Sequence, residues 1–330
     1  MLPSLLIVGL LAGQPRPEPL EDWAGYLRDA LTHSQALARE GRAHVYVEYE
    51  SEHEGKPFKA ELEGDIEWSG ELLYESYAIS SPGYHPFSLS QPDGLRASPP
   101  FNMLITNDEI VVYNGISRLL EFTPKAAPTY RPILHLNPTL TWFSTGAGHS
   151  RKGRPWKDML EYRPRDKSGA EAVIAFTREV NEIIRMRRTD PDGFEVVIDF
   201  SLRHGGNVVR IESTPSAKIT QRHRADYEWV RQGEAYVMQS CRLESNFGGP
   251  NNGPYRYRVV YSDVKLGPQD PAQFTVERVK RNIIGRVRVR DHIRNRTYSF
   301  SGKAEDAGAS FDRLIGVLLS RGFARRGGRL

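Results

Sequence analysis

The run of alternating segments between residues 193 and 266 most narrows what this chain can fold into. The apolar and polar residues alternate through FEVVIDFSL (194–202), VVRIEST (208–214), Ala235–Ser245 and Tyr255–Leu266. In the last of these, tyrosine and valine alternate with arginine. Because successive side chains of a strand point to opposite faces, each segment has one apolar and one charged face. A sheet that is wetted on one side is antiparallel, and its apolar face needs a cover.

The N-terminal third supplies a candidate cover and further strands. Leucines, alanines and a tryptophan recur at three- and four-residue steps through Leu20–Glu40, which predicts an amphipathic helix that ends at Gly41. Alternation then predicts long strands over Ala43–Glu50, Pro57–Ser69 and Leu72–Ile79.

The middle of the chain continues this pattern after a loop at Ser80–Pro100 that is rich in proline, glycine and serine. Strands are expected at Phe101–Thr106, Ile110–Tyr113 and Ile116–Thr123, the last two joined by an Asn114-Gly115 hairpin turn. The sequence also predicts a short helix from Asn137-Pro138 to Phe143, a helical turn at Trp156–Tyr162, and a hairpin of Ala172–Arg178 with Glu182–Arg188.

Together these segments predict a mainly β (α+β) protein. The expected architecture is a curved antiparallel sheet, or an incompletely closed β-barrel, that wraps the N-terminal helix and the short helices inserted between residues 138 and 160. A doubly wound α/β sheet is disfavoured, because the strands follow one another without helices of crossover length.

The N-terminus predicts export. Met1–Gly13 holds an apolar run of about a dozen residues, too short to span a bilayer but suited to a signal-peptide core. Gln14 stands where a lipoprotein signal needs a cysteine, which excludes lipidation. We therefore expect a signal peptide (1–13), a Pro-rich linker (14–19) and a periplasmic or extracellular mature protein.

Charge is distributed unevenly along the chain. Residues 278–330 contain 14 Lys+Arg and four Asp+Glu, a net of +10, whereas the whole chain carries +4. A basic end can contact an anionic membrane surface, although basic residues on strands are more often a solvated face. The predicted division is a domain at 20–277 and a basic C-terminal extension at 278–330. After a boundary at Pro268–Pro271 we expect extended segments at Phe274–Arg281 and Ile283–Arg290, an amphipathic helix from Ser310 to about Phe323, and a disordered tail.

No pattern in the sequence indicates catalysis. The histidines lack metal-ligand spacing on one element, and there is no nucleophile elbow, phosphate loop or dinucleotide-binding glycine motif. The single cysteine, Cys241, lies in an apolar strand, where a small buried residue is expected. Tyr–Arg alternation at 255–258 could suit nucleic acid, but such residues are normal on exposed sheet faces. We expect no enzyme activity, no cofactor, no metal and no nucleic-acid partner.

The order of elements resembles one known family. From Leu20 to Phe274, the chain resembles the bacterial lipoprotein-localisation carriers, the LolA/LolB-like fold, in its helix followed by long strands and inserted short helices. NDEIVVYNGISRLLEF (107–122) looks like that family's central strand–turn–strand, and YRYRVVYSDVKLGPQDPAQF (255–274) looks like its last strands. The family's gating arginine has no unique counterpart here, and residues 282–330 extend beyond the usual C-terminus.

The resemblance implies a carrier that holds acyl chains between an incomplete barrel and a helical lid. Trp23, Leu27 and Leu31 would then be lid residues, and Trp142 and Phe143 would lie on the inserted helix; these five are the predicted ligand-binding residues. Three alternatives stay open: a carrier or binding protein for a lipid or lipoprotein acyl chain, a non-catalytic envelope component whose core is filled by its own side chains, and, with least support, a hydrolase.

Overall fold

The computed structural model describes residues 22–53, 56–80, 101–115, 117–125, 138, 142–143, 154–216, 222–246, 254–283 and 285–302. The predicted signal peptide, the Pro-rich linker, the helix at 310–323 and the C-terminal tail lie outside these residues.

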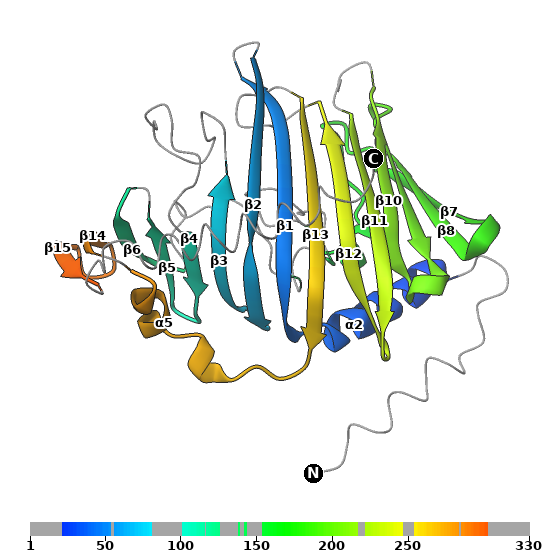
Figure 1. Ribbon diagram of the computed structural model, residues 1–330. Helices are drawn as coiled ribbons and strands as arrows, with labels where there is room; N and C mark the ends of the chain where they lie inside the picture. Colours follow the sequence, from blue (N-terminus) through cyan, green and yellow to red (C-terminus); the bar gives the residue numbers. More distant parts are fainter. Residues whose placement is uncertain are drawn as a thin grey trace, which may run out of the picture.

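The described strands form one sheet of 15 strands, seen face-on in Figure 1. Its order is β15-β14-β6-β5-β4-β3-β2-β1-β13-β12-β11-β10-β9-β8-β7. The strands are β1 (Glu40–His53), β2 (Lys56–Ser69), β3 (Leu72–Ser80), β4 (Phe101–Ile105), β5 (Glu109–Asn114), β6 (Leu119–Pro124), β7 (Val173–Glu179), β8 (Ile183–Thr189), β9 (Glu195–Ser201), β10 (Asn207–Thr214), β11 (His223–Gln232), β12 (Ala235–Ser245), β13 (Tyr255–Leu266), β14 (Arg286–Asp291) and β15 (Arg296–Ser301).

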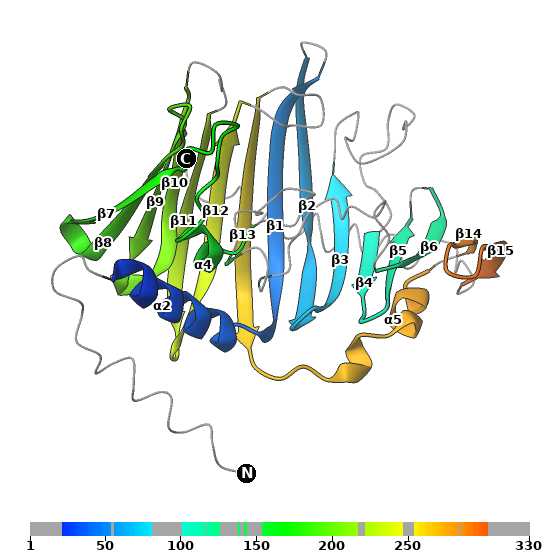
Figure 2. The same ribbon diagram turned by 180° about the vertical axis from the view of Figure 1, so that it is seen from behind.

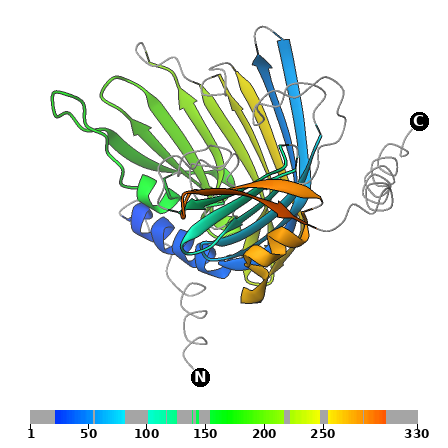
Figure 3. The same cartoon turned by 90° about the vertical axis from the view of Figure 1, so that its left-hand side faces the viewer.

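The predicted fold class is confirmed: the sheet is large, curved and open. Neighbouring strands pair antiparallel, apart from β14, which pairs in parallel with β6. Strands β7 and β15 are the two ends of the sheet, so it does not close. Figure 3, seen from the β15 end, shows how the sheet bends around a concave side.

Helices cover parts of both faces. The helices α2 (Trp23–Leu37) and α4 (Trp156–Met159) lie on the concave face and stand in front of the sheet in Figure 2. The helix α5 (Val276–Arg281) lies on the other face, near β4 and β5 (Figure 1). Three short 3-10 turns complete the described elements: Val180–Glu182, Leu202–His204 and Pro271–Gln273.

The apolar side chains of the alternating strands form two separate hydrophobic cores. The larger core fills the concave side, between the sheet and α2, α4 and Trp142. The smaller core lies beneath α5, where Tyr74, Leu104 and Phe122 meet Val279 and Ile283. The strands β3–β6 bury side chains on both faces, so this part of the sheet lies between the two cores. The central strands bury side chains mainly on the concave face.

The N-terminal helix is shorter than predicted. It starts after Asp22, whose carboxylate accepts a hydrogen bond from the Gly25 N–H at 2.9 Å. Gly41 does not end the helix but already lies in β1. A Cβ on Gly41 would stand 2.7 Å from the Trp68 ring and 2.8 Å from the Lys265 carbonyl, so glycine is needed there for close approach.

Two other local predictions are wrong. Asn114 pairs with Leu119, so β5 and β6 are joined by four residues, and the positive φ of 47° lies at Arg118 rather than in a two-residue Asn-Gly turn. The segment Phe274–Arg281, expected to be extended, contains α5, whose Val279 points into the smaller core. Its spacing of apolar residues suits a helix as well as a strand, and the face of β4–β6 that it covers decides between them.

Polar contacts fix the C-terminal segment to the sheet. Arg278 donates two hydrogen bonds to the Glu67 carboxylate, each 2.7 Å, and its guanidinium lies 3.7 Å from the Tyr74 ring centroid. The Asn282 amide donates to the Tyr74 hydroxyl at 2.7 Å and to the Asn102 side-chain oxygen at 3.0 Å. These contacts explain how β14 and β15 are held beside β6 after a long connection from β13.

Candidate functional site

The helix α2 presents its apolar face to the concave side of the sheet. Of the predicted lid residues, Trp23 and Leu31 are 2% exposed and Leu27 is 0% exposed. The helix approaches β10 closely, because a Cβ on Gly206 (φ +77°) would lie 2.9 Å from the Ala30 Cβ and 3.6 Å from the Leu27 Cδ2. A glycine there permits both the positive φ and the contact.

The other two predicted residues lie beside each other on the same concave side. Trp142 is 0% exposed and Phe143 is 3% exposed. The Trp142 N–H donates to the Pro138 carbonyl at 3.0 Å, in agreement with the predicted helical turn, and the Trp156 N–H donates to the Phe143 carbonyl at 2.8 Å. The inserted segment is thereby joined to α4.

These side chains belong to one aromatic cluster on the concave face. We define it as Trp23, Trp68, Trp142, Phe143, Trp156, Trp229 and Tyr261. The Trp142 ring lies edge-on to three neighbours, with centroids 6.0 Å from Trp68, 6.3 Å from Trp229 and 5.3 Å from Tyr261. The structure thus places the five predicted residues in one core, where each is packed against protein; that they contact a ligand stays a prediction.

The buried donors of this core that have no hydrogen-bond partner within the described residues include the indole N–H groups of Trp23 and Trp142 and the hydroxyl of Tyr257. Other indoles of the cluster are satisfied: Trp68 donates to the Ala38 carbonyl at 2.9 Å, and Trp229 donates to the Val208 carbonyl at 2.7 Å. An unsatisfied buried donor costs about 1–3 kcal/mol, so a ligand carbonyl or ester oxygen placed there would stabilise the protein.

One acidic residue that was not predicted from the sequence lies on the concave face. Glu75 is 1% exposed and lies opposite Ile66 on β2 and Met103 on β4. Burial raises the pKa of Tyr77 well above its usual value, and the charge of Glu75 adds to that shift. The signal in the sequence is a glutamate in phase with Leu73 and Tyr77, at a position where alternation calls for an apolar side chain.

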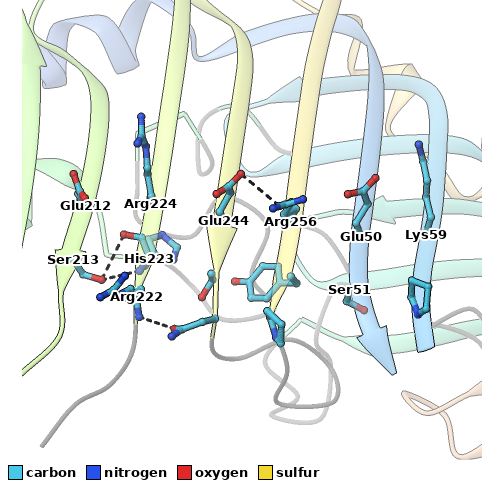
Figure 4. A pocket seen from close by; sticks show the side chains of 15 residues that line it. Glu50, Ser51, Lys59, Glu212, Ser213, Arg222, His223, Arg224, Glu244 and Arg256 are labelled. Atoms are coloured by element: carbon cyan, nitrogen blue, oxygen red, sulfur yellow. Dashed lines mark hydrogen bonds and ion pairs between the residues drawn. The ribbon is translucent and has the colours of Figure 1, made fainter. Parts of the chain in front are cut away.

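A hollow of about 880 Å³ lies at the end of the sheet where β1 and β12 finish and β11 and β13 begin. Figure 4 shows six charged side chains that cross it in a row of alternating sign, one from each of six adjacent strands: Glu212, Arg224, Glu244, Arg256, Glu50 and Lys59. The row includes an exposed ion pair, in which the Arg256 Nε and a Glu244 oxygen lie 3.5 Å apart. Such pairs contribute little, and the three positive and three negative charges of the row cancel. Among the described residues that line the hollow, Arg222 is the one further charged residue besides His223.

No group of three or more histidine, cysteine, aspartate or glutamate residues in the described part of the chain could hold a metal ion. Burial raises the pKa of the Cys241 thiol to about 12, so it is not a thiolate at neutral pH. Among the described helices, none has the length and apolar character needed to cross a membrane.

The fold and the concave aromatic cluster define a single-sheet, open half-barrel with a helical cover.

No family model and no curated protein sequence matches the chain. Similar solved structures include a DUF1329 family protein from Desulfovibrio piger, 9% identical with a TM-score of 0.39, covering 77% of this chain and 98% of that one. A domain named for outer membrane lipoprotein sorting, from Vibrio parahaemolyticus, is 10% identical with a TM-score of 0.38, covering 78% of this chain and 98% of that one. An uncharacterised conserved protein from Thermus thermophilus is 11% identical with a TM-score of 0.26, and the match covers 76% of this chain and 91% of that one.

The matches therefore include a protein with a name from the family that the sequence resembles. At these identities and scores they are likenesses of shape, and what a name says applies to the protein that carries it.

One titratable group on the opposite face predicts a pH dependence of stability. The His44 Nδ1 lies 2.9 Å from an Asp65 oxygen, and its Nε2 lies 3.1 Å from a Glu63 oxygen. The hydrogen bond to Asp65 raises the pKa of His44, against the lowering effect of burial, and Glu63 raises it further. Because the folded pKa exceeds the unfolded value of about 6.5, this contribution is complete below that value and is lost as pH rises through the folded pKa.

We expect His44→Gln to lower the free energy of unfolding more at about pH 5.5 than at about pH 9, by less than about 1 kcal/mol because both carboxylates are exposed. Urea unfolding of parent and variant at the two pH values measures the difference. A loss that is equal at both, or larger at the higher pH, would contradict the assignment.

Proposed function

We propose that the protein is an exported, non-catalytic carrier that binds the acyl chain of a lipid-like ligand between α2 and the concave face of the sheet. Trp23, Leu27 and Leu31 would contact the chain from the helix, and Trp142 and Phe143 would contact it from the inserted segment. The periplasm or the outside of the cell is the proposed location, because Met1–Gly13 has the composition of a signal-peptide core.

The observation that carries this proposal is the unsatisfied polarity of the aromatic cluster. An interior built only for stability has little reason to bury the indole donors of Trp23 and Trp142 without acceptors. An acyl ester brings both apolar CH₂ groups, each worth about 0.8 kcal/mol when buried, and carbonyl oxygens that accept hydrogen bonds. Such a ligand fits an apolar site with a few polar groups.

Binding requires α2 to move, because its apolar residues are packed in the present arrangement. The polar contacts of α2 with the rest of the described chain include the pair of Arg28 with Glu161, the hydrogen bond from the Ser34 hydroxyl to the Gly205 carbonyl at 3.4 Å, and the hydrogen bond from the Trp68 indole to the Ala38 carbonyl at 2.9 Å. The first pair is exposed and the second is long, so each contributes little. The main resistance is apolar burial, which an inserted chain would replace in part.

A second candidate is favoured by the same burial. All five predicted contact residues are 3% exposed or less, as expected for a core filled by its own side chains. In that case the protein would act through its surface as a component of the cell envelope.

Native mass spectrometry of the protein purified from the envelope of its own host separates the two candidates. We expect a lipid-sized adduct that is lost on denaturation, and a fluorescent fatty acid that binds the delipidated protein with a Kd in the micromolar range, about −8 kcal/mol. Protein of unliganded mass that binds no fatty acid would contradict the carrier and favour the filled core.

A further inference from the structure

The strand β14 carries a stripe of arginines on one face. Arg286, Arg288 and Arg290 are exposed, whereas Val287 and Val289 between them are buried in the smaller core. Side chains two residues apart on one face of a strand lie roughly 6.6 Å from each other, so the stripe is about 13 Å long.

Hydroxyl groups stand beside the arginines on the next strand. In the register of β14 with β15, Arg286 lies opposite Ser301, Arg288 opposite Ser299 and Arg290 opposite Thr297. An Arg286 nitrogen also donates to the Ser299 hydroxyl at 3.2 Å. Guanidinium and hydroxyl groups together are the donors that proteins use for phosphate oxygens.

The arginine stripe shares a face with the concave side of the sheet. Arg290 pairs with Glu121 on β6, Glu121 with Val112 on β5, and Val112 with Met103 on β4. Residues opposite each other in neighbouring strands project to the same face; Met103 belongs to the larger core, and the partly buried Val112 packs against it. Three strand spacings, about 14 Å, therefore separate the stripe from the apolar concave surface.

Few carboxylates neutralise this surface. Residues 286–301 contain five arginines and one aspartate, a net of +4. That aspartate, Asp291, is engaged by Arg294 at 2.8 Å, and Glu121 lies 3.6 Å from an Arg290 nitrogen. Neither contact reaches Arg286 or Arg288. Arginines that pair with no carboxylate in the described part of the chain are open to an anionic ligand.

We propose that Arg286, Arg288 and Arg290, with the hydroxyls of Thr297, Ser299 and Ser301, bind the phosphate of a phospholipid whose acyl chains lie on the concave face. This inference rests on the proposed function and names its ligand class: an anionic phospholipid rather than a neutral acyl compound. The alternating charges of the hollow in Figure 4 offer no comparable excess of positive charge.

Three soluble probes separate the phosphate from the chains: dioctanoylphosphatidylglycerol below its micelle concentration, dioctanoylglycerol, and glycerol 3-phosphate. Each is titrated calorimetrically into the parent, into Arg286→Gln/Arg288→Gln/Arg290→Gln, and into a control triple with the same loss of charge. The control is Arg178→Gln/Arg231→Gln/Arg256→Gln, which changes exposed arginines on β7, β11 and β13. Thermal unfolding of all three proteins verifies that they fold.

We expect the β14 triple variant to raise the Kd of the phosphatidylglycerol at least tenfold, about 1.4 kcal/mol, and to leave that of dioctanoylglycerol within about twofold. The control should bind both lipids like the parent.

An equal loss for both lipids, no loss for either, or the same loss in the control would overturn the assignment. Glycerol 3-phosphate that binds as tightly as the lipid would make this a site for free phosphate and would also overturn it. If dioctanoylglycerol fails to bind the parent while the phosphatidylglycerol binds through the arginines, the acyl-carrier proposal fails and the phosphate site stands.

Discussion

Trp68→Ala is expected to lower the free energy of unfolding by about 3–5 kcal/mol, as for other fully buried aromatic residues. Trp68 is 0% exposed and joins three parts of the molecule. Its indole N–H donates to the Ala38 carbonyl at the end of α2, its ring lies edge-on to Trp142, and it fills the space left by Gly41 on β1. The alanine variant loses these contacts together and leaves a cavity between the sheet and its cover.

Urea unfolding followed by tryptophan fluorescence or circular dichroism measures this effect. Trp68→Phe keeps a ring but leaves the Ala38 carbonyl without its donor, so we expect a smaller loss of about 1–3 kcal/mol. Tyr298→Ala changes an aromatic residue that is 47% exposed and should stay within about 0.5 kcal/mol of the parent. A Trp68→Ala variant as stable as the Tyr298→Ala control would show that α2 and Trp142 are not packed on β2 as described.

Strand alternation predicted most of the sheet because period-two patterning depends only on which face is buried. The strands β9, β10, β12 and β13 lie close to the ranges expected from the sequence. The predictions were wrong at positions where contacts between distant parts of the chain determine the local backbone structure. Glycine is needed at position 41 for the close approach to Trp68 rather than for a helix end, and the turn after Asn114 takes its positive φ at Arg118.

The parallel pairing of β14 with β6 could not be predicted from local patterns. It depends on α5 covering the outer face of β4–β6 and on the contact of Arg278 with Glu67, two residues 211 positions apart. The sequence showed Arg286, Arg288 and Arg290 in alternation with valines, but not which face of the sheet they share. Only the register of β14 places them on the concave side.

For the candidate site, periodicity predicted that Trp23, Leu27 and Leu31 form one helix face, and the structure places them together under the sheet. Periodicity could not distinguish a core from a ligand site, because both need apolar side chains on that face. The polar features that bear on this distinction are Glu75 and the indole donors, and their burial emerges only when the strands are assembled.

The carrier proposal predicts that a covalent tether between α2 and the sheet abolishes ligand binding. Ser34 on α2 and Gly205 are close enough for a disulfide, because the Ser34 Oγ lies 3.4 Å from the position of a Cβ on Gly205. A cysteine at Gly205 takes a positive φ of +67° and its Cβ lies 3.1 Å from the Tyr236 ring, so the single Gly205→Cys variant also measures the cost of that substitution. Native Cys241 will not compete, since burial raises the pKa of its thiol to about 12. In Ser34→Cys/Gly205→Cys, oxidation should hold α2 in place and leave an acyl chain no room beside Trp23 and Leu27.

The most direct measurement is titration of delipidated Ser34→Cys/Gly205→Cys with a fluorescent fatty acid, before and after reduction, with the two single-cysteine variants as controls. We predict that the oxidised protein binds at least a hundredfold more weakly than the reduced protein, about 2.7 kcal/mol, and that reductant leaves the single variants unchanged. Equal binding by the oxidised and reduced forms, with the disulfide verified by mass spectrometry, would contradict the account, because the ligand would then bind without any displacement of α2.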